Sequence, residues 1–318
     1  MKTIKFIAFL NILLFSGFIA AAYETEITVA QDGSGDFTSI QSAIDASKAF
    51  PDTRVNIYIK NGTYYEKVRV PACNTKLSLI GEDPEKTILT YDDYFNKIDR
   101  GRNSTFYTYT LKVDADEFYA ENLTIINSAG AVGQAVALHV QGDRCVFKNC
   151  RILGNQDTLY TAGELSRQHF KNCYIEGTTD FIFGAATVLF DDCTVNSLSN
   201  SYVTAASTPK GKKYGYVFRN CKLTAAEGVD KVMLGRPWRD YAKTVYLNCE
   251  LGSHIIPEGW ANWGGTTRDK TAFYAEYQST GIGANPNARL EWCKQLSDEE
   301  AAEYTLENIF APVCVSFE

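Results

Sequence analysis

The sequence is poor in the side chains that carry several common enzyme chemistries. Its 318 residues include only three histidines, at positions 139, 169 and 254. No serine stands in a G-x-S-x-G elbow, so a Ser-His-Asp hydrolase has little support. There is no H-E-x-x-H zinc motif and no P-loop either. His169 directly precedes Phe170 and is interpreted as an ordinary strand residue.

Basic residues do not outnumber acidic ones, and the formal net charge is −7. Because phosphate binding rests on clustered Lys and Arg, an acidic chain argues against nucleic acid as a partner. The same charge disfavours long-range attraction of a polyanion. A charged polymer would therefore have to be held locally, by individual residues and apolar contacts.

Long apolar stretches are confined to the N-terminus. Residues 1–22 begin with Lys2 and Lys5, continue with an apolar run broken by Asn11, and end in three alanines. This pattern predicts a cleaved secretory signal, which leaves a mature domain of residues 23–318 with a net charge of −7 − 2 = −9. A membrane anchor is the alternative, but the apolar run is too short for it. We therefore expect a secreted or periplasmic protein with no membrane-spanning segment.

Short strands separated by Gly and Asn dominate the rest of the chain. Residues 39–48 carry apolar side chains at helical spacing and predict one short amphipathic helix. Residues 91–110 have no clear period and are interpreted as a long loop, of the kind that carries function on a rigid scaffold. Residues 298–306, after a capping Ser297, predict a terminal helix. The predicted strands include residues 27–30, 55–59, 77–81, 87–90 and 271–277.

One short phrase occurs six times in register through the middle of the chain. A central Asn or Asp is preceded two positions earlier by an aromatic residue and followed at once by a cysteine, except in the first copy, which has Ala and Leu there. An aliphatic residue stands three positions after the centre. The central residues are Asn122, Asn149, Asn172, Asp192, Asn220 and Asn248, at intervals of 27, 23, 20, 28 and 28 residues. Such a repeat indicates stacked structural units.

The spacing within the phrase predicts how these units stack. In a straight strand, the positions two before and one after the central residue would face opposite sides, yet both are apolar. A left-handed bend at the centre, which Asn and Asp tolerate best among non-glycine residues, turns both toward the interior. We therefore predict an all-β protein, a single-stranded right-handed parallel β-helix with short terminal helices. An antiparallel sandwich or barrel is the alternative, and it would not repeat one motif at this period.

The nine cysteines divide into two groups. Those of the repeat predict a buried column of free thiols that serve as core. They are Cys150, Cys173, Cys193, Cys221 and Cys249. The sequence leaves open a disulfide among Cys73, Cys145, Cys293 and Cys314. No Cys-His cluster has the spacing of zinc ligands.

Two aspartates follow the repeat at one common offset. Asp157 comes eight residues after Asn149, and Asp180 comes eight residues after Asn172. On coils roughly 4.8 Å apart the two carboxylates would lie close together, so that one is driven toward its protonated form. An acid beside a carboxylate is suited to hydrolysis. Arg236, in a rigid Gly-Arg-Pro turn, is the candidate cation that keeps one of them ionised. The alternative is that both aspartates only end turns, which is the commoner role of an exposed Asp.

Four segments around these residues resemble the signature segments of the pectin methylesterases, carbohydrate esterases that act on methylated homogalacturonan. They are residues 133–138, 154–160, 177–184 and 234–238. The resemblance extends from Gly35 to Tyr304 and so covers nearly the whole mature chain. One departure is His139, where the family commonly has Arg, and it bears on substrate preference.

The resemblance implies a role for each matching residue. Asp180 would be the nucleophile on the methyl-ester carbonyl, and Asp157 the acid that protonates the departing methanol and then the base that activates water. Gln134 and Gln156 would donate hydrogen bonds to the oxyanion, while Arg236 would hold Asp180 ionised. The implied substrate-binding residues are Trp238, Tyr160, Phe181 and Thr179. The resemblance also implies methylesterified pectin as substrate, a monomer, and no metal or organic cofactor.

Two other functions stay open at this point. A pectate lyase or polygalacturonase could share the architecture, with Asp191 and Asp192 as a candidate acid pair, although Asp192 belongs to the repeat. A calcium-dependent lyase would need several carboxylates around a metal, whereas Asp157 and Asp180 are flanked by amides. A non-catalytic β-helix that binds polysaccharide would show the repeat without the matched aspartates, glutamines and arginine.

Overall fold

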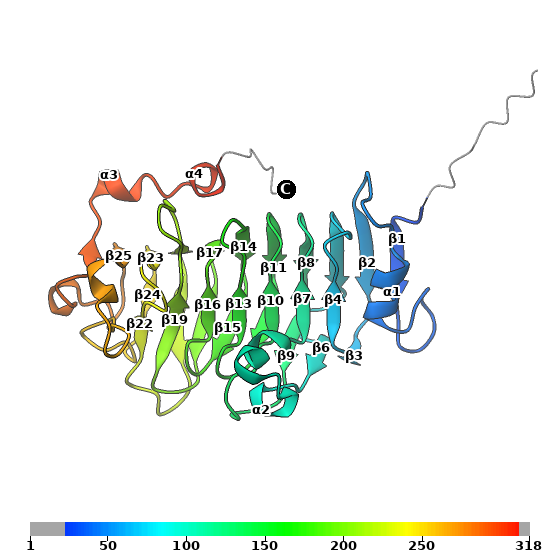
Figure 1. The fold of residues 1–318 in the computed structure, drawn as a ribbon, viewed down its shortest axis with the longest axis horizontal. Helices are drawn as coiled ribbons and strands as arrows, with labels where there is room; N and C mark the ends of the chain where they lie inside the picture. The colour runs from blue at the N-terminus through cyan, green and yellow to red at the C-terminus, as the bar shows by residue number, and fades with distance from the viewer. Residues whose placement is uncertain (1–22, 312–318) are drawn as a thin grey trace, which may run out of the picture.

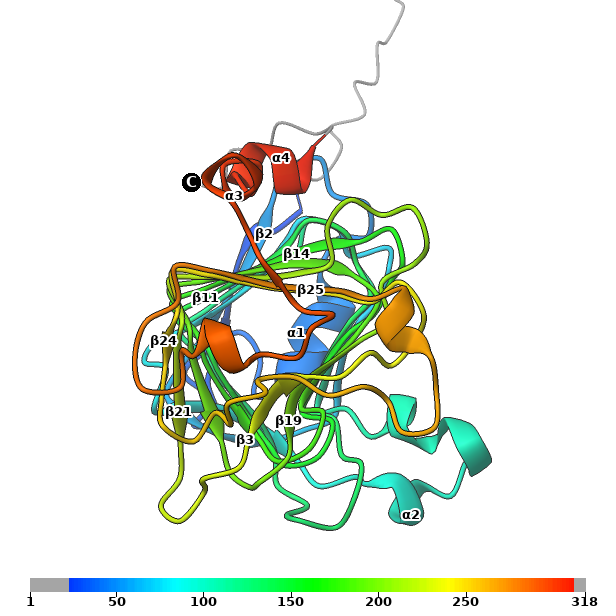
Figure 2. The ribbon, with the colours of Figure 1, turned by 90° about the vertical axis from the view of Figure 1, so that its left-hand side faces the viewer.

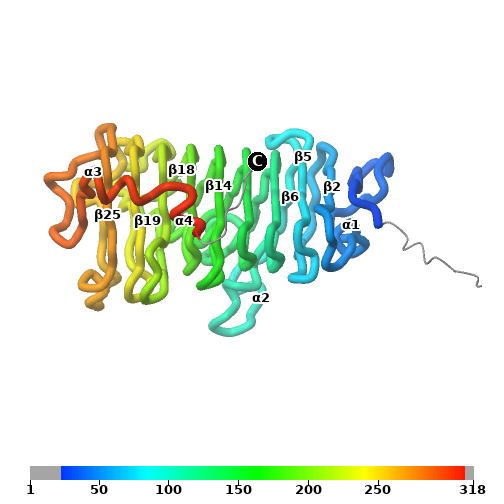
Figure 3. Tube along the Cα trace, turned by 90° about the horizontal axis from the view of Figure 1, so that it is seen from above, coloured from blue at the N-terminus to red at the C-terminus, as the bar shows by residue number. Residues whose placement is uncertain are grey.

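The computed structural model describes residues 23–311. The chain winds as a right-handed parallel β-helix whose coils stack along one axis, from β1 (Glu26–Val29) at one end to β25 (Phe273–Tyr277) at the other (Figure 1 and Figure 3). The predicted fold class is confirmed. The predicted signal segment, residues 1–22, lies outside the described residues, as do residues 312–318. No helix within residues 23–311 is long and apolar enough to cross a membrane.

Three parallel sheets form the walls of the coil, and each turn takes one strand from each sheet. Sheet A consists of β1, β2 (Val55–Ile59), β5 (Leu77–Gly81), β8 (Tyr119–Glu121), β11 (Cys145–Lys148), β14 (Arg167–Lys171), β17 (Thr187–Asp191), β20 (Tyr216–Arg219), β23 (Lys243–Leu247), β25 and β26 (Lys294–Gln295). Sheet B consists of β3 (Gly62–Tyr65), β6 (Thr87–Tyr91), β9 (Thr124–Asn127), β12 (Arg151–Leu153), β15 (Tyr174–Gly177), β18 (Thr194–Ser197), β21 (Lys222–Ala225) and β24 (Glu250–Leu251). Sheet C consists of β4 (Val68–Val70), β7 (Leu111–Val113), β10 (Leu138–Val140), β13 (Leu159–Thr161), β16 (Ile182–Gly184), β19 (Tyr202–Ala206) and β22 (Met233–Gly235).

The predicted bend at the centre of the repeat is present in all six copies. The residues Asn122, Asn149, Asn172, Asp192, Asn220 and Asn248 have φ between 51° and 57°. Each stands between a strand of sheet A and a strand of sheet B, and Asn149 Nδ2 donates a hydrogen bond of 2.6 Å to Asn122 Oδ1. Gln278, with φ of 48° after β25, occupies the same place one coil later. The repeat did not predict this seventh member, because neither Asn nor Asp marks it.

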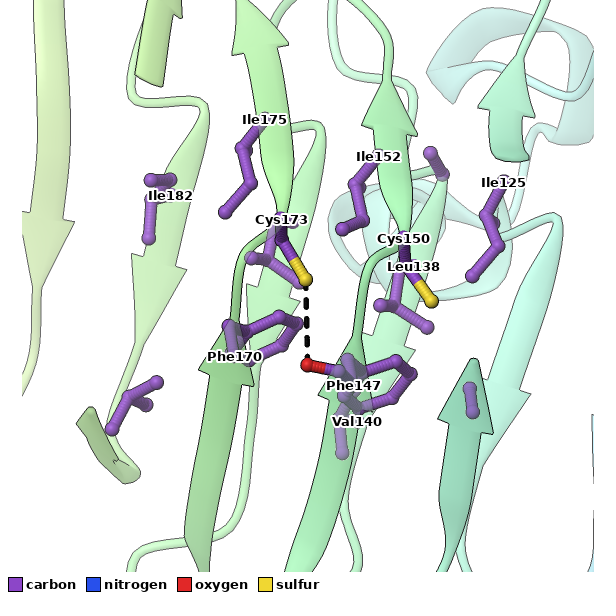
Figure 4. Packing of buried hydrophobic residues seen from close by; sticks show 14 of the residues in the cluster. Ile125, Leu138, Val140, Phe147, Cys150, Ile152, Phe170, Cys173, Ile175 and Ile182 are labelled. Atoms are coloured by element: carbon purple, nitrogen blue, oxygen red, sulfur yellow. Dashed lines mark hydrogen bonds between the residues drawn. The ribbon is translucent and has the colours of Figure 1, made fainter. Parts of the chain in front are cut away.

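The residues on both sides of the bend face the core, as predicted. Phe147, Phe170, Phe190, Phe218 and Tyr246 are paired in register across sheet A. Neighbouring rings stack with centroids 4.4 to 5.2 Å apart. On the other side of the bend the column cysteines are buried free thiols, and Cys173 Sγ lies 3.3 Å from the Phe147 carbonyl oxygen to which it donates (Figure 4). Cys73, Cys145 and Cys293 are also free, and Cys314 lies outside the described residues.

A short helix packs at the N-terminal end of the coil. Helix α1 (Ile40–Ala46) begins at Ser39, whose side chain accepts a hydrogen bond from the Ser42 N–H. Its apolar face buries Ile40, Ala43 and Ile44 in the main core beside β1 (Figure 1). The helix predicted for residues 39–48 is therefore confirmed.

The predicted C-terminal helix is two helices instead of one. Helix α3 (Asp298–Ala301) and helix α4 (Leu306–Phe310) lie outside sheet A (Figure 2). The break between them has a local cause, because the Thr305 side chain caps α4 and the Tyr214 hydroxyl donates a 2.7 Å hydrogen bond to the Glu303 carbonyl. An unbroken helix from 298 to 306 would lose both contacts.

Candidate active site

Asp157 and Asp180 occupy the same place on adjacent coils. Each stands two residues before a strand of sheet C, and the first residues of those strands, Leu159 and Ile182, are paired. Both aspartates have left-handed backbone, with φ of 64° and 50°. The Asp157 N–H donates a 3.1 Å hydrogen bond to the Thr179 carbonyl, which ties one turn to the next. The common offset in the sequence thus corresponds to a common position in the coil.

Arg236 reaches Asp180 from two coils further on. It follows β22, and its guanidinium donates two hydrogen bonds to the carboxylate, Nε to Oδ1 at 3.0 Å and Nη2 to Oδ2 at 2.6 Å. The same guanidinium lies between the rings of Tyr202 and Trp263, 4.0 and 4.1 Å from their centroids. Such a clamp fixes the plane of the guanidinium and, through it, the orientation of the Asp180 carboxylate.

The two carboxyl groups differ in their electrostatic surroundings. Burial, and then the charge of Asp180, raise the pKa of Asp157 well above its usual range, while Arg236 opposes this only through its charge. Burial also raises the pKa of Asp180, but the hydrogen bonds from Arg236 lower it. Within residues 23–311 no hydrogen bond engages the Asp157 side chain. The geometry therefore favours a protonated Asp157 beside an ionised Asp180.

Two glutamines lie next to this pair. Gln134 and Gln156 form a parallel bridge on neighbouring coils, and both side chains line the same cleft as the aspartates. No other residue of the described chain forms a hydrogen bond with either side-chain amide. Their N–H groups are therefore free to donate to a bound oxyanion.

A cleft of about 300 Å³ contains all five of these side chains. One wall comes from residues 91–110, which the sequence predicted as a loop and which contain helix α2 (Phe95–Ile98) and the 3-10 helix η1 (Gly101–Tyr107). This segment projects from the side of the coil (Figure 1). Asn127 holds it in place, since its Nδ2 donates to the carbonyls of Asp93, Thr108 and Val136. The remaining lining residues are Arg102, Thr105, Phe106, Phe183, Ala205, Trp238 and Trp263.

Comparison with known proteins identifies the family. The Pectinesterase family model matches residues 26–312. Pectinesterase 31 of Arabidopsis thaliana is 37% identical over 294 residues, which are 90% of this chain and 92% of that protein. The chain belongs to the pectinesterase family. Three other Arabidopsis relatives are named probable pectinesterase/pectinesterase inhibitor, and the chain spans about half of their length.

Solved pectin methylesterases share the fold over most of their length. The enzyme from carrot superposes with a TM-score of 0.84 at 34% identity, covering 90% of this chain and 92% of that chain. A pectin methylesterase in complex with a hexasaccharide gives a TM-score of 0.78 at 29% identity, covering 94% and 100%. As a pectinesterase, the chain is a hydrolase that cleaves the methyl esters of pectin, as the resemblance of its motifs implied.

Only some of the residues predicted to contact substrate line the cleft of this pectinesterase. Trp238 lines the cleft. Tyr160 stacks on Phe183 with ring centroids 4.6 Å apart, and Thr179 accepts a hydrogen bond from the Ser201 hydroxyl at 2.8 Å. Neither Tyr160 nor Thr179 is among the residues that line the cleft, so a contact of either one with substrate remains a prediction.

Phe181 is wrong as a substrate contact. It is 0% exposed and packs in the main core. It directly follows the left-handed Asp180, as Cys173 follows Asn172, and the bend turns the next side chain inward in both places. Gly177 makes room for it, because a Cβ there would lie 2.3 Å from the Phe181 Cβ. The aromatic ring that does line the cleft from this strand is that of Phe183.

His139 is enclosed in an aromatic row on the outer face of sheet C. It pairs with Tyr160 in the adjacent strand, with ring centroids 4.6 Å apart, and lies 6.2 Å from the Tyr109 ring. Burial, with the nearby charge of Lys112, lowers the pKa of His139 to about 4. The residue is therefore neutral near pH 7.

The alternative acid pair lies elsewhere. Asp191 forms an ion pair with Arg219 across sheet A, with Nη2 and Oδ2 2.7 Å apart. Asp192 has the left-handed φ of the repeat, 54°. Neither residue lines the cleft that contains Asp157 and Asp180. Asp191 and Asp192 are structural residues, and their interpretation as the acid pair of a polygalacturonase is wrong.

Proposed function

We propose that this chain removes methanol from methylesterified pectin through a covalent intermediate on Asp180. The carboxylate of Asp180 attacks the ester carbonyl carbon, and the resulting oxyanion accepts hydrogen bonds from Gln134 and Gln156. When the intermediate collapses, the methoxy oxygen takes the proton of Asp157 and leaves as methanol. This leaves an anhydride between the substrate carbonyl and Asp180.

Water completes the cycle in the second half of the proposed reaction. Asp157, now ionised, takes a proton from water as the water oxygen attacks the same carbonyl carbon. Asp180 departs as a carboxylate, and the substrate retains a free carboxyl group. Arg236 is a positioning residue in this scheme, because it orients Asp180 and opposes the rise of its pKa. Trp238 offers an apolar face to a sugar ring.

The observation that carries the proposal is that two aspartates at equivalent positions make different contacts. They share one position on adjacent coils, yet only Asp180 receives a bidentate cation contact. A turn-ending role would require neither the clamp nor the free amides beside it. The relatives named pectin methylesterase, one of them in complex with a hexasaccharide, support a polysaccharide substrate.

The remaining parts of the proposal concern the chain as a whole. Residues 1–22 act as a secretory signal, residues 23–318 form the catalytic domain, and the protein works outside the cytoplasm. It acts as a monomer, since the reaction proposed above needs no side chain from a second copy. A methanol-release assay on methylated pectin tests the activity. A rise in the absorbance of unsaturated uronides without methanol would instead identify a lyase.

A further inference from the structure

Arg102 lies in the cleft without a partner. It belongs to η1 and lines the cleft together with Thr105 and Phe106. Its side chain is exposed and makes no ion pair or hydrogen bond with any other residue of the described chain. By contrast, Arg239 lies 4.6 Å over the Trp238 ring, and Arg268 donates to the Pro237 carbonyl at 3.3 Å. Arg102 is thus an unengaged guanidinium beside the reacting groups.

The backbone that carries Arg102 is fixed although its side chain is free. The Ser104 hydroxyl accepts a hydrogen bond from the Arg100 N–H at 2.8 Å and donates to the Gly101 carbonyl at 2.9 Å. At the end of η1, the Thr108 hydroxyl accepts from the Val136 N–H at 2.8 Å. These contacts tie η1 to Val136, which stands two residues before β10, and β10 pairs with β13, the strand that follows Asp157.

Arg102 gives the cleft a surplus positive charge. The other charged lining residues are Asp157, Asp180 and Arg236. Asp180 and Arg236 form an ion pair with each other, and burial raises the pKa of Asp157, which favours its neutral form. The formal charge of the whole chain is nevertheless −7. An acidic protein does not attract anions over a long distance. Arg102 is therefore suited to contact an anionic group of a ligand that other contacts already hold in the cleft.

We propose that Arg102 binds the free carboxylate of a galacturonate unit next to the ester that is cleaved. This inference rests on the proposed function, since pectin carries methyl esters and free carboxylates on one chain. A guanidinium matches a carboxylate through two parallel hydrogen bonds, which a lysine could not provide. Arg102 is therefore a specificity residue that favours partly de-esterified pectin. It also makes the unesterified product a competitive ligand.

The first test measures binding apart from catalysis. An unesterified hexagalacturonate is titrated calorimetrically into the wild type, Arg102→Gln and Arg100→Gln. Arg100→Gln is the matched control, because it removes the same charge two residues away. Arg100 stacks over Tyr107 and does not line the cleft. Arg102→Gln should weaken binding about fivefold, the size of one partly exposed ion pair, and Arg100→Gln less than twofold. Equal effects of the two variants, or no binding to the wild type, would overturn the proposal.

The second test uses methanol release from pectins that differ only in their degree of methylation. The kcat/KM ratio between partly and fully methylated pectin should fall about fivefold in Arg102→Gln, through KM, and the remaining ratio should lose most of its salt dependence. An unchanged ratio contradicts the role of Arg102. Absence of methanol release in the wild type contradicts the proposed activity instead, and the calorimetric result still decides on Arg102.

Discussion

Arg236 grips Asp180 through two parallel hydrogen bonds, of 3.0 and 2.6 Å, while Asp157 on the neighbouring coil receives none. Two identical residues in equivalent places thereby have different electrostatic surroundings, because hydrogen bonds from Arg236 lower the pKa of Asp180 and none lowers that of Asp157. The β-helix places Asp157 and Asp180 at equivalent positions, and Arg236, two coils further on, makes them different because it contacts only Asp180. The consequences can be tested by changing the arginine, either aspartate or their surroundings.

Replacing Arg236 by lysine separates charge from geometry. Lysine keeps the positive charge, but it lacks the planar fork that contacts both oxygens and fits between the rings of Tyr202 and Trp263. We expect Arg236→Lys to lower kcat roughly 10²-fold with a smaller change in KM, because the loss affects the position of the nucleophile. Steady-state methanol release checks this. A kcat close to that of the wild type would show that charge alone suffices.

Removing the cation should move the pH dependence upward. The proposed mechanism predicts that the wild type loses activity at low pH, when Asp180 becomes protonated, and at high pH, when Asp157 loses its proton. Arg236 lowers the pKa of both groups against the effect of burial, so Arg236→Ala raises both. Both limbs of the kcat/KM profile should shift to higher pH, and the shift belongs to the pair because the two groups are coupled. An unchanged profile would mean that another group sets the ionisation of Asp180.

The aspartates should behave as one catalytic unit. Asp180→Ala should reduce methanol release by roughly four orders of magnitude or more, and Asp157→Ala should also be severely impaired. The double variant should be little worse than the more damaged single variant, since members of a unit are not additive. Far-ultraviolet circular dichroism controls for the fold. Turnover like that of the wild type in Asp180→Ala would rule out the covalent intermediate.

Much of this site was predictable, because residues at equal offsets from the repeat occupy equal positions on adjacent coils. The offset of eight residues placed Asp157 and Asp180 together, since each follows a left-handed bend by the same path. Arg236 could be named because a rigid turn presents it after a strand of the same sheet. The spacing of these three residues in the sequence therefore predicted that their side chains lie together.

The rest of the site depends on segments that the repeat does not govern. Trp263 and Arg102 reach the cleft from the loop after β24 and from η1, so no offset relates them to the aspartates. Tyr202, which contacts Arg236 without lining the cleft, is in register with Asp180 one coil later, but it stands ten residues after Asp192 and not eight. Phe181 is a different case, because the rule that turns Cys173 inward after Asn172 applies equally after Asp180. The inward position of Phe181 was therefore predictable, because Asp tolerates the left-handed conformation as Asn does.

Phe181 and Trp238 should therefore respond differently to the same change. Phe181→Ala removes a fully buried ring and should lower the free energy of unfolding by about 3 to 5 kcal/mol. Trp238→Ala removes a half-buried ring that lines the cleft, and should raise KM for methylated pectin roughly tenfold, equivalent to ~1.4 kcal/mol, with little change in unfolding. Urea titrations and methanol release on both variants make the comparison. The opposite pattern would restore Phe181 as a substrate contact.

Glu276 and Arg289 form a buried ion pair that supports the turn carrying Arg236. Their side chains are only 3% and 2% exposed, and Arg289 Nε donates to Glu276 Oε1 at 2.6 Å. Trp260 Nε1 donates to the same oxygen at 3.3 Å, and Trp260 itself bridges Gly235, the residue before Arg236. The pair therefore lies behind the backbone that positions the clamp on Asp180.

Removing one partner of this pair should lower the free energy of unfolding by more than the intact pair contributes to it. Glu276→Gln leaves the Arg289 guanidinium buried without a counter-charge, so we expect the free energy of unfolding to fall by about 3 to 5 kcal/mol. The double variant Glu276→Leu with Arg289→Met removes both charges and should recover a large part of that loss, because no unpaired ion remains. Lys60→Met, which breaks an exposed pair with Glu82, is the control and should leave the unfolding midpoint in urea nearly unchanged. If the double variant unfolds as easily as Glu276→Gln, then the hydrogen bonds of Arg289 to the Pro257 and Gly283 carbonyls matter more than its charge partner.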